Sequence, residues 1–141
     1  MFHIDPEVRR RGVDFDAPCE GDAGFDLRSA ESIVLETAKQ AVVSTGLKLA
    51  IPKGYVGLIR ERSSMALKRV YTHAGVIDAA YRGEIKIVLS NTSEHNFHIE
   101  IGDKIAQLIV VPCVTACHEA IEVDQLGVTR RGEGGFGSTG R

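Results

Sequence analysis

The chain has 141 residues, which gives room for one domain and little else. Hydrophobic residues make up 43% of it, enough for one core, and the formal net charge is -2. A nucleic-acid-binding protein usually carries a basic stripe and a high pI, and a disordered chain has lower hydrophobicity and a higher net charge, so this composition argues against both. One feature stands out: of the 15 glycines, six fall in the last 15 residues.

The charged amino terminus lacks the apolar stretch of a signal peptide, and the longest nearly apolar segment, residues 105–111, is too short to span a bilayer. The three cysteines Cys19, Cys113 and Cys117 cannot all pair within one chain, as expected in a reducing compartment. We therefore predict a cytoplasmic protein with no membrane partner. Cys113, Cys117 and His118 resemble part of a zinc site, but the missing second ligand pair favours a packing role.

Alternating and β-branched apolar runs, separated by turn signals, follow one another along the chain and indicate strands. These runs cover residues 32–36, 41–51, 55–59, 84–89, 96–101, 104–111 and 114–123. The one stretch that favours a helix is residues 63–68, where a serine can cap the first turn. Many short strands with closely spaced turns predict an all-β sandwich or barrel.

The composition changes at about Leu126, so we expect a core of residues 1–126 and a separate segment of residues 127–141. That segment has too few apolar side chains to pack by itself, which is typical of a frayed terminus. It also combines glycine N–H groups, hydroxyls and arginines, the groups that anion binding requires. Composition alone leaves fraying and phosphate binding equally favoured.

Two nucleotide-binding patterns in this segment are excluded. Residues 132–137 satisfy G-x-G-x-x-G, and residues 132–138 have part of the Walker A spacing. Both sites need a helix after the loop, but only a few residues remain, and no lysine precedes the hydroxyl residue of the second pattern.

Five short motifs place polar residues at predicted turns, outside the β pattern. Each motif alone has an ordinary explanation as a strand end, a helix cap or a turn. In chain order they span residues 23–27, 62–65, 75–83, 102–108 and 131–140.

Together, in this order and at these spacings, the five motifs resemble those of the trimeric dUTP diphosphatases (dUTPases). The resemblance covers about residues 23–140 and implies an all-β, jelly-roll-like distorted β-barrel (the dUTPase-like β-clip) with one short helix. It further implies a homotrimer with shared active sites, each closed by a mobile glycine-rich C-terminal arm. The implied reaction is Mg²⁺-dependent hydrolysis of dUTP to dUMP and pyrophosphate, which keeps uracil out of DNA and supplies dUMP for dTMP synthesis.

The resemblance assigns nucleoside recognition to the third motif. The hairpin that begins with Gly75, Val76 and Ile77 would hold uracil through its backbone. A rigid hairpin of this kind rejects a base with a different donor pattern because polar atoms would be left unpaired. Tyr81 would lie under the deoxyribose, where its ring leaves no space for a 2'-hydroxyl.

Two aspartates match functional positions of the family. Asp78 matches the catalytic base, which orients and deprotonates a water for in-line attack on the α-phosphorus. Asp26 matches an aspartate that contacts the water shell of the metal. Because Mg²⁺ retains water and binds phosphate oxygens, no direct protein ligand to it is expected.

The remaining matches concern the triphosphate and the arm. Ser63 would contact the bridge between the α- and β-phosphates, Arg131 would reach the γ-phosphate, and Phe136 would cover the uracil ring. The other substrate-binding matches are Arg62, Ser64, Lys86, Gln107, Gly137 and Ser138. The alternation of its strand would equally place Lys86 on a solvated face.

The sequence departs from the family pattern at two positions: Glu61 stands where relatives often have proline, and Phe25 replaces a frequent tyrosine. A dCTP deaminase of the same fold, or a bifunctional dCTP deaminase and dUTPase, is the first alternative. Deaminases use a glutamate on the strand after the hairpin, where this sequence has Val88, although Glu84 lies nearby.

A trimeric β-barrel that binds a partner without catalysis is the second alternative. It gives no reason for Asp78, Arg62, Gln107 and Arg131 to occur together with the arm.

Overall fold

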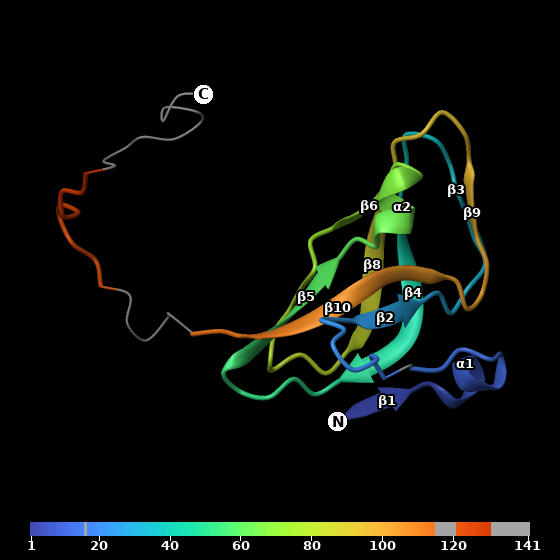
Figure 1. The fold of residues 1–141 in the computed structure, drawn as a ribbon, viewed down its shortest axis with the longest axis horizontal. Helices are drawn as coiled ribbons and strands as arrows, with labels where there is room; N and C mark the ends of the chain where they lie inside the picture. The colour runs from blue at the N-terminus through green and yellow to red at the C-terminus, as the bar shows by residue number, and fades with distance from the viewer. Residues whose placement is uncertain (16, 115–120, 131–141) are drawn as a thin grey trace.

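The computed structural model describes residues 1–15, 17–114 and 121–130, and strands dominate this part of the chain (Figure 1). The all-β prediction is therefore confirmed. The strands are β1 (Phe2–Ile4), β2 (Phe25–Arg28), β3 (Ile33–Leu35), β4 (Gln40–Leu49), β5 (Tyr55–Arg60), β6 (Val70–His73), β7 (Val76–Ile77), β8 (Glu84–Asn91), β9 (Phe97–Ile99) and β10 (Lys104–Pro112). The two helices are α1 (Pro6–Arg10) and α2 (Ser63–Leu67).

The strands form two four-stranded sheets and a two-stranded ribbon. The first sheet has the order β1-β4-β8-β6, the second has the order β2-β10-β5-β7, and β3 pairs with β9. Neighbouring strands are antiparallel, and most are far apart in the sequence, as in a jelly roll. Within the described residues these sheets are open, so the structure is jelly-roll-like without a closed barrel.

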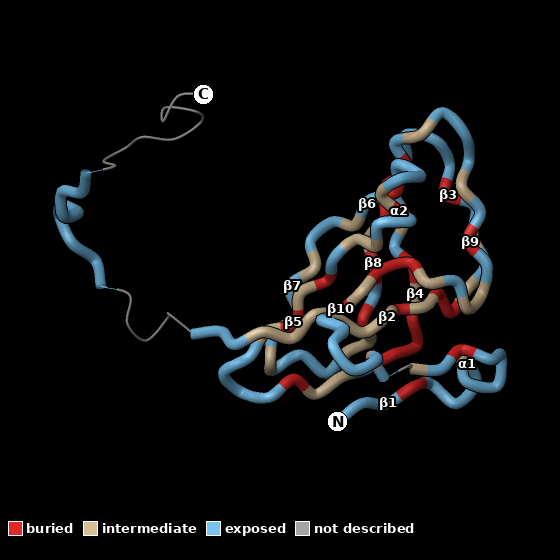
Figure 2. The backbone as a smooth tube through the Cα atoms, in the orientation of Figure 1, coloured by how far each residue is buried: buried red, intermediate tan, exposed pale blue. Residues whose placement is uncertain are grey.

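The core is built from alternating residues of the long strands. Ile85, Ile87 and Leu89 of β8 are at most 1% exposed, while Lys86 between them faces outward. They pack with Val43 of β4 and Leu108 of β10 in one cluster, and the buried segments are red in Figure 2. Burying each such side chain stabilises the fold by about 1.5–3 kcal/mol. This cluster therefore holds in place the strands that carry the polar site residues.

The strands predicted within residues 32–111 are all present, with shifted ends, as β3, β4, β5, β8, β9 and β10. The prediction of a strand over 114–123 is wrong where it can be compared, because Val114 and residues 121–123 lie in no strand. Residues 115–120, including Cys117 and His118, lie outside the described residues. Cys113 is free and exposed, so the packing role predicted for it is not seen.

The helix prediction was incomplete. The helix predicted over 63–68 is α2, but its N-cap is Arg62, which makes no side-chain cap hydrogen bond, so the predicted serine cap is wrong. Helix α1 was not predicted; there, Asp5 accepts the Glu7 N–H at 2.8 Å and Pro6 begins the helix. Among the described residues, no helix is long and apolar enough to cross a membrane.

Candidate active site

Except for Gly75, the predicted site residues that the structure describes line two cavities. The first cavity, of about 630 Å³, lies among β1, β4, β7 and the start of β8, and it includes Val76, Ile77, Asp78, Tyr81 and Lys86 in its lining. The second, of about 350 Å³, is lined by residues that include Asp26, Arg62, Ser63, Ser64 and Gln107. Among the described residues the two linings share no member, so the two groups of predicted site residues line different cavities of the chain.

The hairpin of the third motif begins with a tight turn. Ala74 and Gly75 both have positive φ angles, of 57° and 98°, and they turn the chain from β6 into β7. The Gly75 carbonyl accepts the Ile59 N–H at 2.7 Å, and β7 then pairs with β5. Because β7 is the last strand of its sheet, the backbone of Val76 and Ile77 has one edge that no strand among the described residues covers. A free edge of this kind can pair with the polar edge of a ligand.

Tyr81 is fixed at the rim of the first cavity. Its hydroxyl donates to the Glu84 carbonyl at 2.8 Å, and its N–H donates to the Asp78 carbonyl at 3.0 Å. The ring occupies the place where a side chain of Gly83 would stand, since a Cβ there would lie 2.4 Å from the Tyr81 hydroxyl oxygen. Residue 83 must therefore be glycine for the ring to keep this position.

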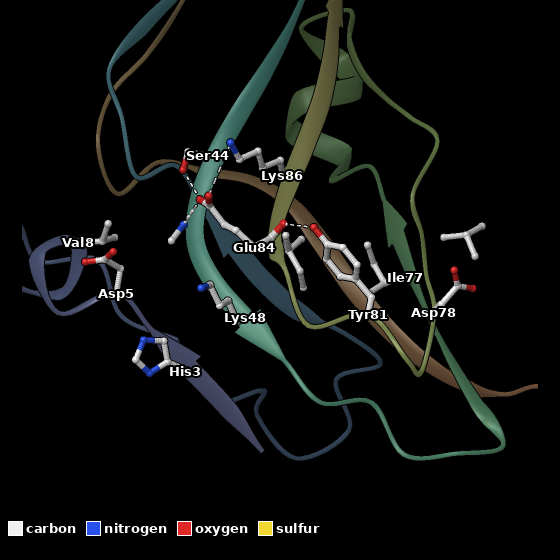
Figure 3. A pocket seen from close by; sticks show the side chains of 13 residues that line it. His3, Asp5, Val8, Ser44, Lys48, Ile77, Asp78, Tyr81, Glu84 and Lys86 are labelled. Atoms are coloured by element: carbon white, nitrogen blue, oxygen red, sulfur yellow. Dashed lines mark hydrogen bonds and ion pairs between the residues drawn. The ribbon is translucent and has the colours of Figure 1, made fainter.

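Asp78 is an exposed residue of the same hairpin. In Figure 3 the side chains of Tyr81 and Ile77 lie between Asp78 and Glu84. The Asp78 carboxylate is therefore free of the polar cluster at Glu84 and accessible from solvent, as an activating group for a water requires.

Glu84 and Lys86 form a polar cluster with strand β4, on the side of the first cavity opposite Asp78 (Figure 3). The Glu84 carboxylate accepts hydrogen bonds from the Ser44 hydroxyl and from the Gly46 N–H, and it lies 3.8 Å from the Lys86 ammonium. Burial alone would raise the pKa of Glu84, but these hydrogen bonds and the Lys86 charge outweigh it and lower the pKa below 4.5. Glu84 is thus held as a carboxylate.

The second cavity is built around Asp26. Its carboxylate lies 2.8 Å from Arg62 Nε and 2.7 Å from Lys104 Nζ, and all three side chains are only 25–35% exposed. Asp26 is not on a turn, as predicted, but within β2, where it is the cross-strand partner of Gln107 on β10. Two cations face one carboxylate, which leaves this cluster positively charged and suited to an anion.

Gln107 is held by the backbone of the preceding motif. Its amide donates to the Glu61 carbonyl at 2.8 Å, and Gly24 leaves room beside its oxygen. The Glu61 carboxylate accepts a hydrogen bond from the Thr72 hydroxyl at 3.0 Å. The pKa of Glu61 is lowered, first by a hydrogen bond from its own backbone N–H, and then by Thr72 and nearby positive charge. Any residue at position 61 would offer the carbonyl that Gln107 uses.

Ser63 and Ser64 form the start of α2, exposed toward the second cavity, where both hydroxyls can meet a ligand. Arg131, Phe136, Gly137 and Ser138, which the sequence analysis placed at the site, lie outside the described residues. Within the part that the structure describes, no group of three or more His, Cys, Asp or Glu side chains could hold a metal ion.

The sequence analysis missed Lys104 as a site residue, and strand alternation explains why. Residues 104 and 107, three apart on a regular strand, face opposite sides. The register of β10 on β2 shifts between Lys104 and Ala106, and this irregularity lets Lys104 reach Asp26. The only sequence signal was its place in the fourth motif.

Comparison with known proteins identifies the family. The dUTPase family model matches residues 13–140. The chain belongs to the dUTPase family. A protein of Tropheryma whipplei (strain Twist) named deoxyuridine 5'-triphosphate nucleotidohydrolase is 49% identical over 127 residues, covering 86% of this chain and 85% of the relative.

Two solved dUTPase structures share the fold. The dUTPase of Staphylococcus bacteriophage 80alpha with dUPNHPP has a TM-score of 0.89 and 32% identity, covering 100% of this chain and 98% of that chain. A mutant dUTPase from phage phi11 of S. aureus, described with a structural Mg(II) ion, has a TM-score of 0.76 and 28% identity, covering 92% and 97%. These similarities favour the dUTPase interpretation over the dCTP deaminase alternative.

Proposed function

We propose that the chain is a dUTP diphosphatase, which hydrolyses dUTP to dUMP and pyrophosphate. The observation that carries this function is the match to the dUTPase family over residues 13–140, which includes the predicted site residues of both cavities. The geometry supports separate roles for the two cavities: the first binds the nucleoside, and the second binds the triphosphate.

The nucleoside is recognised by the hairpin. The free edge of β7 supports pairing of the Val76 and Ile77 backbone with the polar edge of uracil, and Gly75 fixes the turn before it. Tyr81 would lie against the deoxyribose. Since the ring is fixed at its hydroxyl and against Gly83, a 2'-hydroxyl on the sugar would meet a side chain that cannot move aside.

In the chemical step, Asp78 orients a water and takes its proton as the water oxygen attacks the α-phosphorus. A bond forms between that oxygen and phosphorus, the bond from the α-phosphorus to the bridging oxygen breaks, and pyrophosphate leaves with the electron pair. A positioned general base of this type contributes about 10²–10⁴-fold to the rate.

The triphosphate is held by side chains of the second cavity, with help from the first. Arg62 and Gln107 are anchored by Asp26 and by the Glu61 carbonyl, so their donors are already oriented. Oriented donors stabilise charge that develops on the leaving group without reorganisation during the reaction. The other residues in this role are Ser63, Ser64 and Lys86, together with Arg131, Gly137 and Ser138 of the arm.

The second cavity fits Mg²⁺ bound through the triphosphate rather than through a set of protein ligands. Asp26 is engaged by two cations, and the described residues offer no group of three metal-binding side chains. Asp26 would therefore contact the water shell of the ion, whose role is to neutralise phosphate charge. The phi11 dUTPase, with its structural Mg(II) ion, is a precedent for the metal within the family.

We also propose that the enzyme is a homotrimer with shared sites. The hairpin and the phosphate-binding residues line different cavities of one chain, which supports a site that a second copy completes. Residues 127–141 would form an arm, with Phe136 over the uracil ring. Residues 121–130 are exposed throughout in the single chain, which supports a partner for this segment. The cytoplasmic location stays a prediction from the cysteines.

The products of two incubations test the function. The protein is mixed with Mg²⁺ and either dUTP or dCTP, and pyrophosphate and ammonia are measured. We expect pyrophosphate from dUTP and no ammonia from dCTP. Ammonia from dCTP would support the deaminase alternative, and the absence of both products would contradict any enzymatic function of this family.

A further inference from the structure

We propose that Glu84 is a positioning residue that sets the preference of the site for the deoxyribose over the ribose nucleotide. Its carboxylate fixes the start of β8 to strand β4, and its carbonyl holds the Tyr81 hydroxyl. The role depends on the function proposed above, because it concerns the sugar side of the same cavity.

The carboxylate acts where the ladder between β4 and β8 is irregular. Ser44 pairs with Lys86 and Lys48 pairs with Glu84, so four steps on β4 face two steps on β8. Regular ladder hydrogen bonds cannot satisfy the backbone across such a bulge. The Glu84 carboxylate takes their place by accepting the Gly46 N–H at 2.8 Å and the Ser44 hydroxyl.

The bulge has little freedom on its other side. Gly46 has a φ of +65°, and a Cβ there would lie 2.8–3.0 Å from atoms of Val8. The Gly46 carbonyl also accepts the Asp5 N–H at 2.9 Å. The amino-terminal segment therefore packs against the bulge from one side, and the Glu84 carboxylate binds it from β8.

The same residue holds Tyr81 through its backbone. The Tyr81 hydroxyl donates to the Glu84 carbonyl at 2.8 Å, and Figure 3 shows Tyr81 reaching toward the start of β8. Any shift of residue 84 relative to β4 therefore moves the acceptor of the Tyr81 hydroxyl. Since the ring excludes a 2'-hydroxyl only while it is fixed, releasing the carboxylate should weaken that exclusion.

Three variants separate positioning from general stability. Glu84→Ala removes both acceptor oxygens, whereas Glu84→Gln keeps one oxygen for the Gly46 N–H. Glu31→Ala is the matched control, because Glu31 accepts the Ser44 N–H at 2.7 Å and so also holds β4, but it does not line the first cavity. Melting temperatures of all three show how far each change loosens the fold.

The readout is the ratio of the dissociation constants of UMP and dUMP, measured by calorimetry, with the ratio of kcat/KM for dUTP and UTP beside it. We expect Glu84→Ala to reduce both ratios by about tenfold, since tenfold corresponds to one mispositioned contact. Glu84→Gln and Glu31→Ala should leave both ratios close to those of the unmodified chain. Unchanged ratios in Glu84→Ala, or an equal loss in Glu31→Ala, would overturn the positioning role.

Two further outcomes are distinguishable. If Glu84→Ala shows no cooperative melting, Ser44→Ala replaces it, because this variant removes one hydrogen-bond donor to the carboxylate and leaves β8 unchanged. Both ratios should then fall by about threefold, and unchanged ratios would overturn the role of Glu84. An unmodified chain that releases no pyrophosphate from dUTP would contradict the proposed function itself. A preference for dUMP that survives in these variants contradicts only the role of Glu84.

Discussion

Asp26 on β2 and Arg62 at the start of α2 form an ion pair of 2.8 Å, and the same carboxylate lies 2.7 Å from Lys104. One negative charge thus orients two positive ones at the edge of the second cavity. The pair is worth little as a stabilising surface contact, because its members are a quarter or more exposed. Its value lies in presenting two oriented cations to a ligand that carries several negative charges.

Asp26→Asn should tighten binding of pyrophosphate in the absence of Mg²⁺ by about fivefold, because it removes the carboxylate that pairs with both Arg62 and Lys104. Isothermal calorimetry measures this affinity. Turnover of dUTP with Mg²⁺ should fall in the same variant, because the carboxylate for the water shell of the ion is lost. Asp103→Asn is the control for net charge, since Asp103 accepts the Glu100 N–H away from the cavity. Weaker pyrophosphate binding in Asp26→Asn would contradict this account.

Asp78→Asn should lower kcat for dUTP by about 10²–10⁴-fold while leaving the affinity for the dUTP analogue dUPNHPP nearly unchanged, because an amide can contact a water but cannot take its proton. Steady-state kinetics and calorimetry measure the two quantities. A kcat within about threefold of the unmodified enzyme would show that another group acts as the base.

The sequence predicted the long strands well because hydrophobic alternation is a local property. Residues 84–89 read as a strand, and Ile85, Ile87 and Leu89 do alternate into the core. It missed β1, β2, β6 and β7, the short edge strands of the two sheets, which exist because the longer strands beside them offer pairing partners. No local pattern in Val76 and Ile77 distinguishes such an edge strand from a turn.

The same holds for the site: residues in local motifs could be predicted from the sequence, whereas contacts that depend on tertiary structure could not. The motifs identified Asp26, Arg62 and Gln107, because residue type and spacing carry the family resemblance. The contacts of Lys104 with Asp26 and of Glu84 with Gly46 both occur at irregularities of strand register. Register shifts are set by how two distant strands meet, so the sequence of either strand alone did not reveal them.

Mixing two inactive variants should restore activity if each site takes its hairpin and its phosphate cavity from different copies. Asp78→Asn disables the hairpin and Arg62→Ala disables the phosphate cavity, so each variant alone should be inactive. After joint unfolding and refolding in equal amounts, about one half times one half, or one quarter, of the sites should hold two intact halves. Pyrophosphate release from dUTP measures the recovery. No recovery from a mixture that refolds into mixed oligomers would place both halves in one chain.

The lowered pKa of Glu84 predicts how acid affects the fold. Because burial is outweighed by hydrogen bonds from Ser44 and Gly46 and by the Lys86 charge, the folded-state pKa lies below the ordinary value of 4.5. The ionised carboxylate therefore stabilises the fold above that value, and this contribution is lost as the pH falls through the folded-state pKa. Lys48, His3 and Asp5 also line this cavity.

Melting temperatures as a function of pH test this sign. The melting temperature of the unmodified chain should exceed that of Glu84→Gln most at pH values above about 5. The difference should shrink as the pH falls through the folded-state pKa of Glu84, because the protonated carboxyl, like the amide, carries no charge. Glu94→Gln makes the same charge change at an exposed position outside both cavities and controls for net charge. A difference that grows on acidification would contradict a lowered pKa.

Gly83→Ala should damage nucleoside binding more than it damages the fold. The new Cβ would lie 2.4 Å from the Tyr81 hydroxyl oxygen and 2.6 Å from the ring carbon that bears it, so the ring must move and its hydrogen bond to the Glu84 carbonyl must break. We expect KM for dUTP to rise by about tenfold or more, because the ring would no longer support the deoxyribose. Gly54→Ala is the control: its φ of +85° makes alanine strained there, but no atom of the described part of the chain lies within 4 Å of the new Cβ. Gly54→Ala should melt at a lower temperature but keep its KM for dUTP. An equal rise of KM in both variants would show that loosening of the fold, rather than displacement of Tyr81, is responsible.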